Sequence, residues 1–223
     1  FVNRALKRKV ENPVFGATRN PYDLRRSAGG SSGGAAVALS TGMVSLADGS
    51  DMMGSLRNPA AWNNIYGMRP TFGVVPDEPD GEIFLDQLST LGPMARSPSD
   101  LAALLDTMAG RDPGWPHGYQ IDATLPGLSE AVPAPRIGWL SDWGGGLPME
   151  AGVIPLCEEA LGQMAQLGWH VETPAPLFDL DAMWPAWVSL RSFSIAGARR
   201  MDAEDPARRD KLKPAMIWEI ENG

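Results

Sequence analysis

Three serines lie in turns that are rich in glycine. Ser31 and Ser32 lie inside Gly29–Gly34, and Ser55 directly follows Gly54. A serine hydroxyl is an effective nucleophile only when a neighbour accepts its proton and donors stabilise the oxyanion that forms. Glycine-rich turns let successive backbone N–H groups point at one spot and form an anion-binding nest. Two such turns in one chain predict a single active site assembled from both.

Other interpretations of Gly29–Gly34 stay open at this point. The run has the composition of a flexible linker. No Gly-Lys-Ser/Thr sequence follows the glycines, which argues against a phosphate-binding P-loop. A G-x-S-x-G nucleophile elbow requires a preceding strand and a histidine base, and neither is evident near this run.

The composition narrows the chemistry further. The 223-residue chain has one cysteine, Cys157, and two widely separated histidines, His117 and His170. This excludes a disulfide framework and argues against a zinc site or a Ser-His-Asp triad. The net charge of −8 argues against a general binder of nucleic-acid backbones, which needs a basic surface. The sequence contains no uninterrupted apolar run of about 18 residues, so it predicts no transmembrane helix.

The elements that must position the serines alternate between helices and strands. We expect helices over residues 35–39, 98–108, 150–167 and 181–201, a further helix after Ser55, and strands over 44–47, 136–140 and 168–172. Asn3–Val10 has a basic amphipathic pattern, and Asp48–Asp51 has the composition of a turn. Ser97 is the expected N-cap of its helix, with Pro98 in the first helical position. The alternation indicates an α/β fold.

Four blocks of sequence, taken together, resemble the signature of the amidase signature family. They are Gly29–Gly34, Gly49–Ala60, Gly67–Thr71 and Leu91–Ser97 followed by Asp100-Leu101. The resemblance covers residues 12–112, and the remainder is similar only in its order of helices and strands. It implies a mixed β-sheet flanked by helices on both faces, in an incomplete amidase domain that spans residues 1–223.

The resemblance implies hydrolysis of a carbon–nitrogen amide bond by a Ser–cisSer–Lys triad through an acyl-enzyme. Ser55 matches the nucleophile, and Ser31 matches the bridging serine that follows a cis peptide bond. We therefore expect the two hydroxyl groups to lie within hydrogen-bond reach. The resemblance assigns the oxyanion hole to the backbone N–H groups of Met52, Met53, Gly54 and Ser55.

Neighbouring residues have expected supporting roles. Ser32 and Asp51 would orient the two loops, although Asp51 is also a common turn-forming residue. Arg57 either is the buried partner of a structural ion pair or binds the substrate, and we favour the ion pair. Met53 stands where the family usually has glycine, and Ser50 where it usually has threonine. The Met53 side chain either narrows the acyl pocket or packs into the core, and we favour the core.

No lysine in the chain matches the family's catalytic lysine, which precedes the bridging serine by far more than thirty residues. The four lysines are Lys7, Lys9, Lys211 and Lys213. We therefore expect the chain to be an internal fragment that is inactive by itself, with the catalytic lysine outside it.

The function expected from the resemblance is that of an amidase with a small-molecule amide substrate and no metal or organic cofactor. We expect neither nucleic acid nor a membrane as a partner and expect a cytoplasmic location, and a homodimer is left open. The blocks are similar to those of bacterial amidases that include hydrolases of cyclic nylon-oligomer amides, but this does not assign the substrate. One alternative is the glutamine-hydrolysing subunit of a tRNA-dependent amidotransferase. Another is an amidase-like scaffold without activity.

Overall fold

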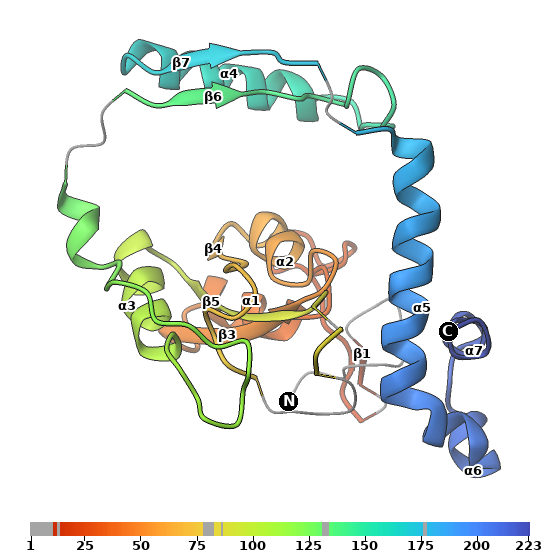
Figure 1. The fold of residues 1–223 in the computed structure, drawn as a ribbon. Helices are drawn as coiled ribbons and strands as arrows, with labels where there is room; N and C mark the ends of the chain where they lie inside the picture. The colour runs from red at the N-terminus through yellow and green to blue at the C-terminus, as the bar shows by residue number, and fades with distance from the viewer. Residues whose placement is uncertain (1–10, 13, 78–82, 86, 131–133, 176–177) are drawn as a thin grey trace. The chain divides into compact units, whose positions relative to one another are not determined.

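The computed structural model describes residues 11–12, 14–77, 83–85, 87–130, 134–175 and 178–223 (Figure 1). The chain forms two compact units, of which the first comprises Phe1–Leu128 with Ser189–Gly223 and the second Ser129–Val188. All predicted site residues belong to the first unit. The predicted amphipathic stretch Asn3–Val10 lies outside the described residues, and the assignment of residues 1–223 to one domain stays a prediction.

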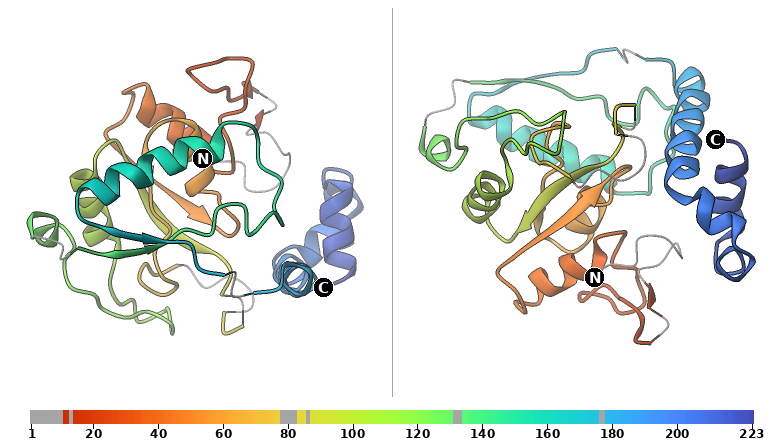
Figure 2. Two further views of the ribbon diagram at one scale, coloured as in Figure 1. Left: turned by 90° about the horizontal axis from the view of Figure 1, so that it is seen from above. Right: turned by 60° about the horizontal axis from the view of Figure 1, so that its bottom comes forward.

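The sheet of the first unit is built around β5 (Thr90–Ala95). β3 (Leu46–Asp51) and β4 (Tyr66–Gly67) pair with it on either side, both antiparallel (Figures 1 and 2). β3 contains all of Asp48–Asp51, so the predicted turn there is wrong. Each residue of this segment has a Cα partner on β5, with Gly49 opposite Gly92. Pairing along the whole of β5 thus overrides the local turn preference.

Three helices pack around this sheet: α1 (Gly33–Ser40), α2 (Arg57–Trp62) and α3 (Pro98–Met108). All three confirm helices expected from the sequence. The predicted N-cap of α3 is also confirmed, because the Ser97 hydroxyl accepts the N–H of Asp100 at 3.1 Å. A buried cluster joins α1, α2, β5 and the loop before α2, and consists of Ala36, Leu39, Leu56, Ala60 and Met94.

The first unit also contains the short antiparallel pair β1 (Glu11–Asn12) and β2 (Gly16–Ala17). Its C-terminal part comprises the end of α5 (Leu180–Glu204), followed by α6 (Pro206–Arg209) and α7 (Pro214–Glu221). The views in Figures 1 and 2 show α7 beside the C-terminal half of α5.

The second unit contains a parallel strand pair, β6 (Arg136–Gly138) and β7 (His170–Glu172), connected by α4 (Val153–Gln166). A short 3-10 helix, η1 (Pro126–Ser129), precedes it in the chain. The strands and α4 fall within the ranges expected from the sequence, and α5 extends beyond both ends of its predicted range. The expected α/β class is confirmed. In the part of the chain that the structure describes, every helix is too short or too polar to cross a bilayer.

Candidate active site

The two serine turns meet through their backbones. The N–H of Ser32 donates to the carbonyl oxygen of Ser55 at 3.2 Å, although 23 residues separate them in sequence. The peptide bond between Gly30 and Ser31 is cis, as the family resemblance implied. Ser32 is buried, whereas Ser31 and Ser55 are half-buried. The structure therefore brings together the two loops that the sequence assigned to one site.

The side chains of the two predicted catalytic serines are not directly bonded. Among the hydrogen bonds of the described residues, none joins the hydroxyl of Ser31 to the hydroxyl of Ser55. The expectation that these two hydroxyl groups lie within hydrogen-bond reach stays a prediction.

Gly49 on β3 allows the Ser32 turn to lie directly against the sheet. A Cβ atom at position 49 would lie 3.0 Å from the Cβ atom of Ser32 and 2.9 Å from the Cδ2 atom of Leu56. A larger residue would push apart the strand, the Ser32 turn and the Ser55 loop. The glycine in the middle of β3 is therefore explained by close approach and not by a turn.

Asp51 organises the loop that carries Ser55. Its side chain is fully buried at the end of β3. The Oδ1 atom accepts the N–H of Gly54 at 2.6 Å, and Oδ2 accepts the N–H of Leu56 at 3.2 Å. The Arg57 guanidinium donates to both oxygens, from Nε at 2.9 Å and Nη2 at 3.0 Å. One carboxylate therefore fixes the chain on both sides of Ser55.

The hydrogen bonds to Asp51 stabilise its charged form. Burial by itself raises the pKa of this carboxyl, but the hydrogen bonds from Arg57, Gly54 and Leu56 outweigh burial and lower the pKa from 3.8 to about 2. Asp51 is therefore a carboxylate at neutral pH. The expected ion pair of Arg57 is confirmed, but its side chain is 55% exposed, so the expected burial is wrong. Only the carboxylate end of the pair is buried.

Arg69 is a second arginine at this loop, to which the sequence analysis gave no role. Its Nε donates to the backbone carbonyl of Asp51 at 3.3 Å, and its Nη2 donates to the carbonyl of Leu88 at 3.0 Å. Arg69 thereby links the end of β3 to the segment that precedes β5 through two hydrogen bonds. Its place in the Gly67–Thr71 block was the signal that could have identified it.

The predicted oxyanion donors differ in their availability. Gly54 has a φ of +101°, and a Cβ there would meet the Asn58 Nδ2 atom at 2.7 Å, so the loop requires glycine at this position. Its N–H is already donated to Asp51. Within the described part of the chain, no acceptor is paired with the N–H groups of Met52, Met53 or Ser55.

The Met53 side chain does not pack into the core, so that prediction is wrong. It is 54% exposed, and its sulfur lies 3.1 Å from the Nη1 atom of Arg191. The same nitrogen lies 3.4 Å from the Met52 sulfur. Arg191 belongs to α5 and is separated from these methionines by more than 130 residues. No motif in the sequence marks it, because only the tertiary fold brings α5 to this loop.

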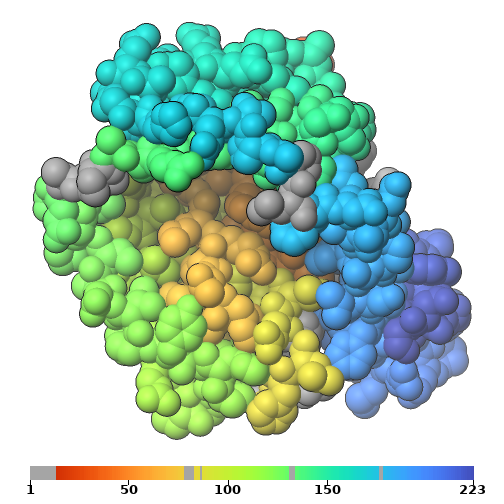
Figure 3. All heavy atoms as spheres, turned by 45° about the horizontal axis from the view of Figure 1, so that its top comes forward, coloured from red at the N-terminus to blue at the C-terminus, as the bar shows by residue number. Residues whose placement is uncertain are grey.

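The surface around these loops is partly apolar. Exposed hydrophobic side chains include Trp62 at the end of α2, Tyr66 on β4 and Met68. Figure 3 shows atoms of this part of the chain, in orange tones, at the surface. The described residues contain no cluster of three or more His, Cys, Asp or Glu side chains suited to a metal ion.

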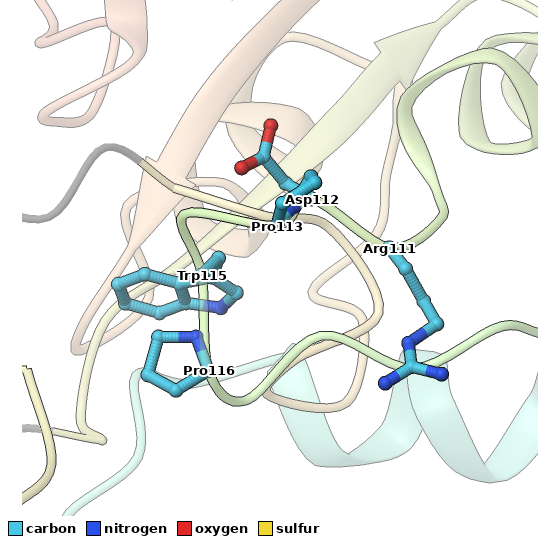
Figure 4. Close-up of a pocket in the computed structure, with 5 residues that line it drawn as sticks. All are labelled: Arg111, Asp112, Pro113, Trp115 and Pro116. Carbon is cyan, nitrogen blue, oxygen red and sulfur yellow. The ribbon is translucent and has the colours of Figure 1, made fainter.

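A separate hollow of about 340 Å³ lies on the loop after α3 (Figure 4). Its lining residues are Arg111, Asp112, Pro113, Trp115 and Pro116. None of the predicted site residues contributes to it. The indole nitrogen of Trp115 is buried without a hydrogen-bond partner.

Comparisons with known proteins agree on one family. The family model described as "Amidase" matches residues 3–220. A glutamyl-tRNA(Gln) amidotransferase subunit of Symbiobacterium thermophilum is 37% identical over 206 residues, which are 86% of this chain and 40% of that protein. Among solved structures, a bacterial aryl acylamidase of the amidase signature family matches 97% of this chain and 46% of its own, with a TM-score of 0.85 and 29% identity. The 6-aminohexanoate cyclic dimer hydrolase bound to substrate matches 97% of this chain and 48% of its own, with a TM-score of 0.84 and 27% identity. The chain thus spans slightly less than half of each of these two enzymes.

Proposed function

Because this chain belongs to the amidase signature family, we propose that the complete protein hydrolyses a carbon–nitrogen amide bond at a site that includes Ser55 and Ser31. The proposal rests on the way the Ser55 loop is held. The Asp51 carboxylate accepts N–H groups on both sides of Ser55, and the Ser32 N–H donates to the Ser55 carbonyl and so joins the two serine turns. A nucleophile needs such fixed surroundings, because misplacement by about 1 Å can cost roughly 100-fold in rate.

In the proposed reaction, the Ser55 hydroxyl attacks the amide carbonyl carbon and gives its proton to Ser31. Ser31 passes its own proton to a base, which the family resemblance identifies as a lysine. The protonated base supplies the proton to the leaving amine as the carbon–nitrogen bond breaks. Water then hydrolyses the acyl-Ser55 ester and regenerates the serine.

The oxyanion of the tetrahedral intermediate requires hydrogen-bond donors, each of which is typically worth about 100- to 1,000-fold in kcat. We assign this role to the backbone N–H groups of Met52, Met53 and Ser55, which have no acceptor among the described residues. Gly54 contributes through its bond to Asp51, which sets the path of the loop. Asp51 is not the general base in this proposal, because a pKa of about 2 makes it a poor proton acceptor at neutral pH.

A second candidate function is glutamine hydrolysis within an amidotransferase. It is favoured by the 37% identity to the amidotransferase protein over 86% of this chain. The two functions differ in dependence on partners. An independent amidase hydrolyses small amides alone, whereas a component of an amidotransferase is expected to need its complex for full glutamine hydrolysis.

Labelling with a fluorophosphonate serine probe, followed by peptide mapping, tests the proposal in the complete protein. The adduct should lie on the peptide that contains Ser55 and should be absent in Ser55→Ala. Ser31→Ala should still be labelled, but about 100- to 10,000-fold more slowly, because proton transfer to a positioned base is lost. The exposed Ser45 provides a matched control, since Ser45→Ala should leave labelling unchanged.

Two results would contradict the assignment. An adduct on Ser31 would reverse the roles of the two serines. Absence of any labelling and of any amide hydrolysis in the complete protein, with and without partner proteins, would favour the scaffold interpretation.

A further inference from the structure

Arg191 connects the C-terminal part of the first unit to the loop that precedes Ser55. It lies on α5, and its Nη1 atom approaches the sulfur atoms of Met52 at 3.4 Å and Met53 at 3.1 Å. These methionines carry two of the three backbone N–H groups assigned to the oxyanion. Arg191 therefore contacts the oxyanion loop through side chains, without occupying any of its backbone donors.

Glu219 on α7 fixes the orientation of this arginine. The Arg191 Nε donates to Oε1 at 2.6 Å, and Nη2 donates to Oε2 at 3.3 Å. The two side chains are only 24% and 16% exposed. A two-point contact between guanidinium and carboxylate restricts rotation of the guanidinium plane. The remaining nitrogen, Nη1, is consequently aimed at the two sulfurs.

The Arg191–Glu219 ion pair can hold the loop that precedes Ser55 without adding net charge to it. Glu219 balances the positive charge of Arg191, so the contact adds no net charge beside Ser55. Thioether sulfur is a weak hydrogen-bond acceptor but is polarisable, so the contact supplies packing and orientation more than strong bonding. The Met53 side chain is 54% exposed and belongs to neither of the buried core clusters of the described residues.

We propose that Arg191, oriented by Glu219, is a positioning residue that holds the Met52–Met53 segment and thereby places the oxyanion donors relative to Ser55. This inference rests on the proposed amidase function. It assigns to α5 and α7 a part in catalysis that lies outside the signature blocks of residues 12–112.

The test uses steady-state kinetics of the complete protein on an amide substrate that it hydrolyses. Arg191→Lys keeps the charge but cannot maintain both the two-point contact with Glu219 and the contact with the sulfurs. We expect kcat to fall about 10- to 100-fold with KM within roughly twofold, because misplaced donors weaken transition-state binding selectively. Met53→Leu preserves size but removes the sulfur acceptor, so kcat should fall in the same direction.

A double-mutant cycle shows whether the two side chains act as one unit. The combined Arg191→Lys and Met53→Leu variant should lose no more kcat than Arg191→Lys alone. Arg199→Lys is the matched control on the same helix, because the Arg199 guanidinium pairs with Asp202 at 3.2 Å and not with the methionine sulfurs. This control should retain the parent kcat. Fluorophosphonate titration of active sites normalises each kcat to correctly folded protein.

The outcomes separate the inference from the proposed function. Loss of activity in Ser55→Ala together with a parent-like kcat in Arg191→Lys would overturn the positioning role alone. An equal loss in Arg191→Lys and Arg199→Lys would also overturn it, because the effect would then be one of helix stability. Full activity in Ser55→Ala would instead refute the proposed function.

Discussion

Replacing Asp51 by asparagine should destabilise the protein through the loop that carries Ser55. The wild-type carboxylate accepts two backbone N–H groups and a two-point contact from Arg57. Lowering its pKa from 3.8 to about 2 corresponds to about 2 kcal/mol of stabilisation, because one pKa unit equals roughly 1.4 kcal/mol. An asparagine also directs an N–H₂ group toward donors that need an acceptor. We therefore expect Asp51→Asn to lower the free energy of unfolding at pH 7 by at least about 2 kcal/mol.

The effect should depend on pH in a defined direction. The pKa of Asp51 is lower in the folded protein than in the unfolded chain, so its stabilisation is fully present above the unfolded pKa of about 4. The stabilisation is lost as the pH falls toward the folded pKa of about 2. The difference in unfolding free energy between wild type and Asp51→Asn should thus shrink by about 1 kcal/mol from pH 5 to pH 3.

Urea denaturation of both proteins at a series of pH values provides the measurement. Asp48→Asn is the matched control, because Asp48 lies on the same strand with an exposed side chain. This control should change stability by less than about 0.5 kcal/mol at every pH. A difference between wild type and Asp51→Asn that stays constant from pH 5 to pH 3 would refute the reasoning.

Three further substitutions in the first unit, with Leu156→Ala in the second unit as a comparison, test packing and capping by thermal or urea denaturation. Gly54→Ala should destabilise by about 1–3 kcal/mol, because its positive φ and the close Asn58 side chain disfavour a Cβ; a neutral result would mean that the loop adopts another backbone. Leu56→Ala should lower the free energy of unfolding by about 2–5 kcal/mol, because the Leu56 side chain is fully buried. Leu156→Ala on α4 should cost much less, because that side chain is 69% exposed, and equal losses would contradict the assigned core. Ser97→Ala should lower the free energy of unfolding by about 1 kcal/mol, because α3 loses its N-cap. An unchanged midpoint of denaturation would contradict this prediction.

The sequence was sufficient for features that depend on neighbouring residues. The start of α3 follows from Ser97 and Pro98, because a cap and a restricted φ act within one helical turn. The serine turns, the order of the signature blocks and the α/β class likewise followed from local patterns. The cis peptide before Ser31 was available only through the family resemblance, since no local composition requires it.

Tertiary structure decided the features that depend on distant partners. The turn-like residues Asp48–Asp51 became part of β3 because β5 supplies a pairing partner for each of them. Asp51 gained its low pKa from groups that converge only when the loop folds back on it. Met53 lies beside Arg191 and not in the core because α5 and α7 bring a charged pair to the loop. Local propensities are too weak to specify such contacts, which form only when long-range pairing and burial outweigh them.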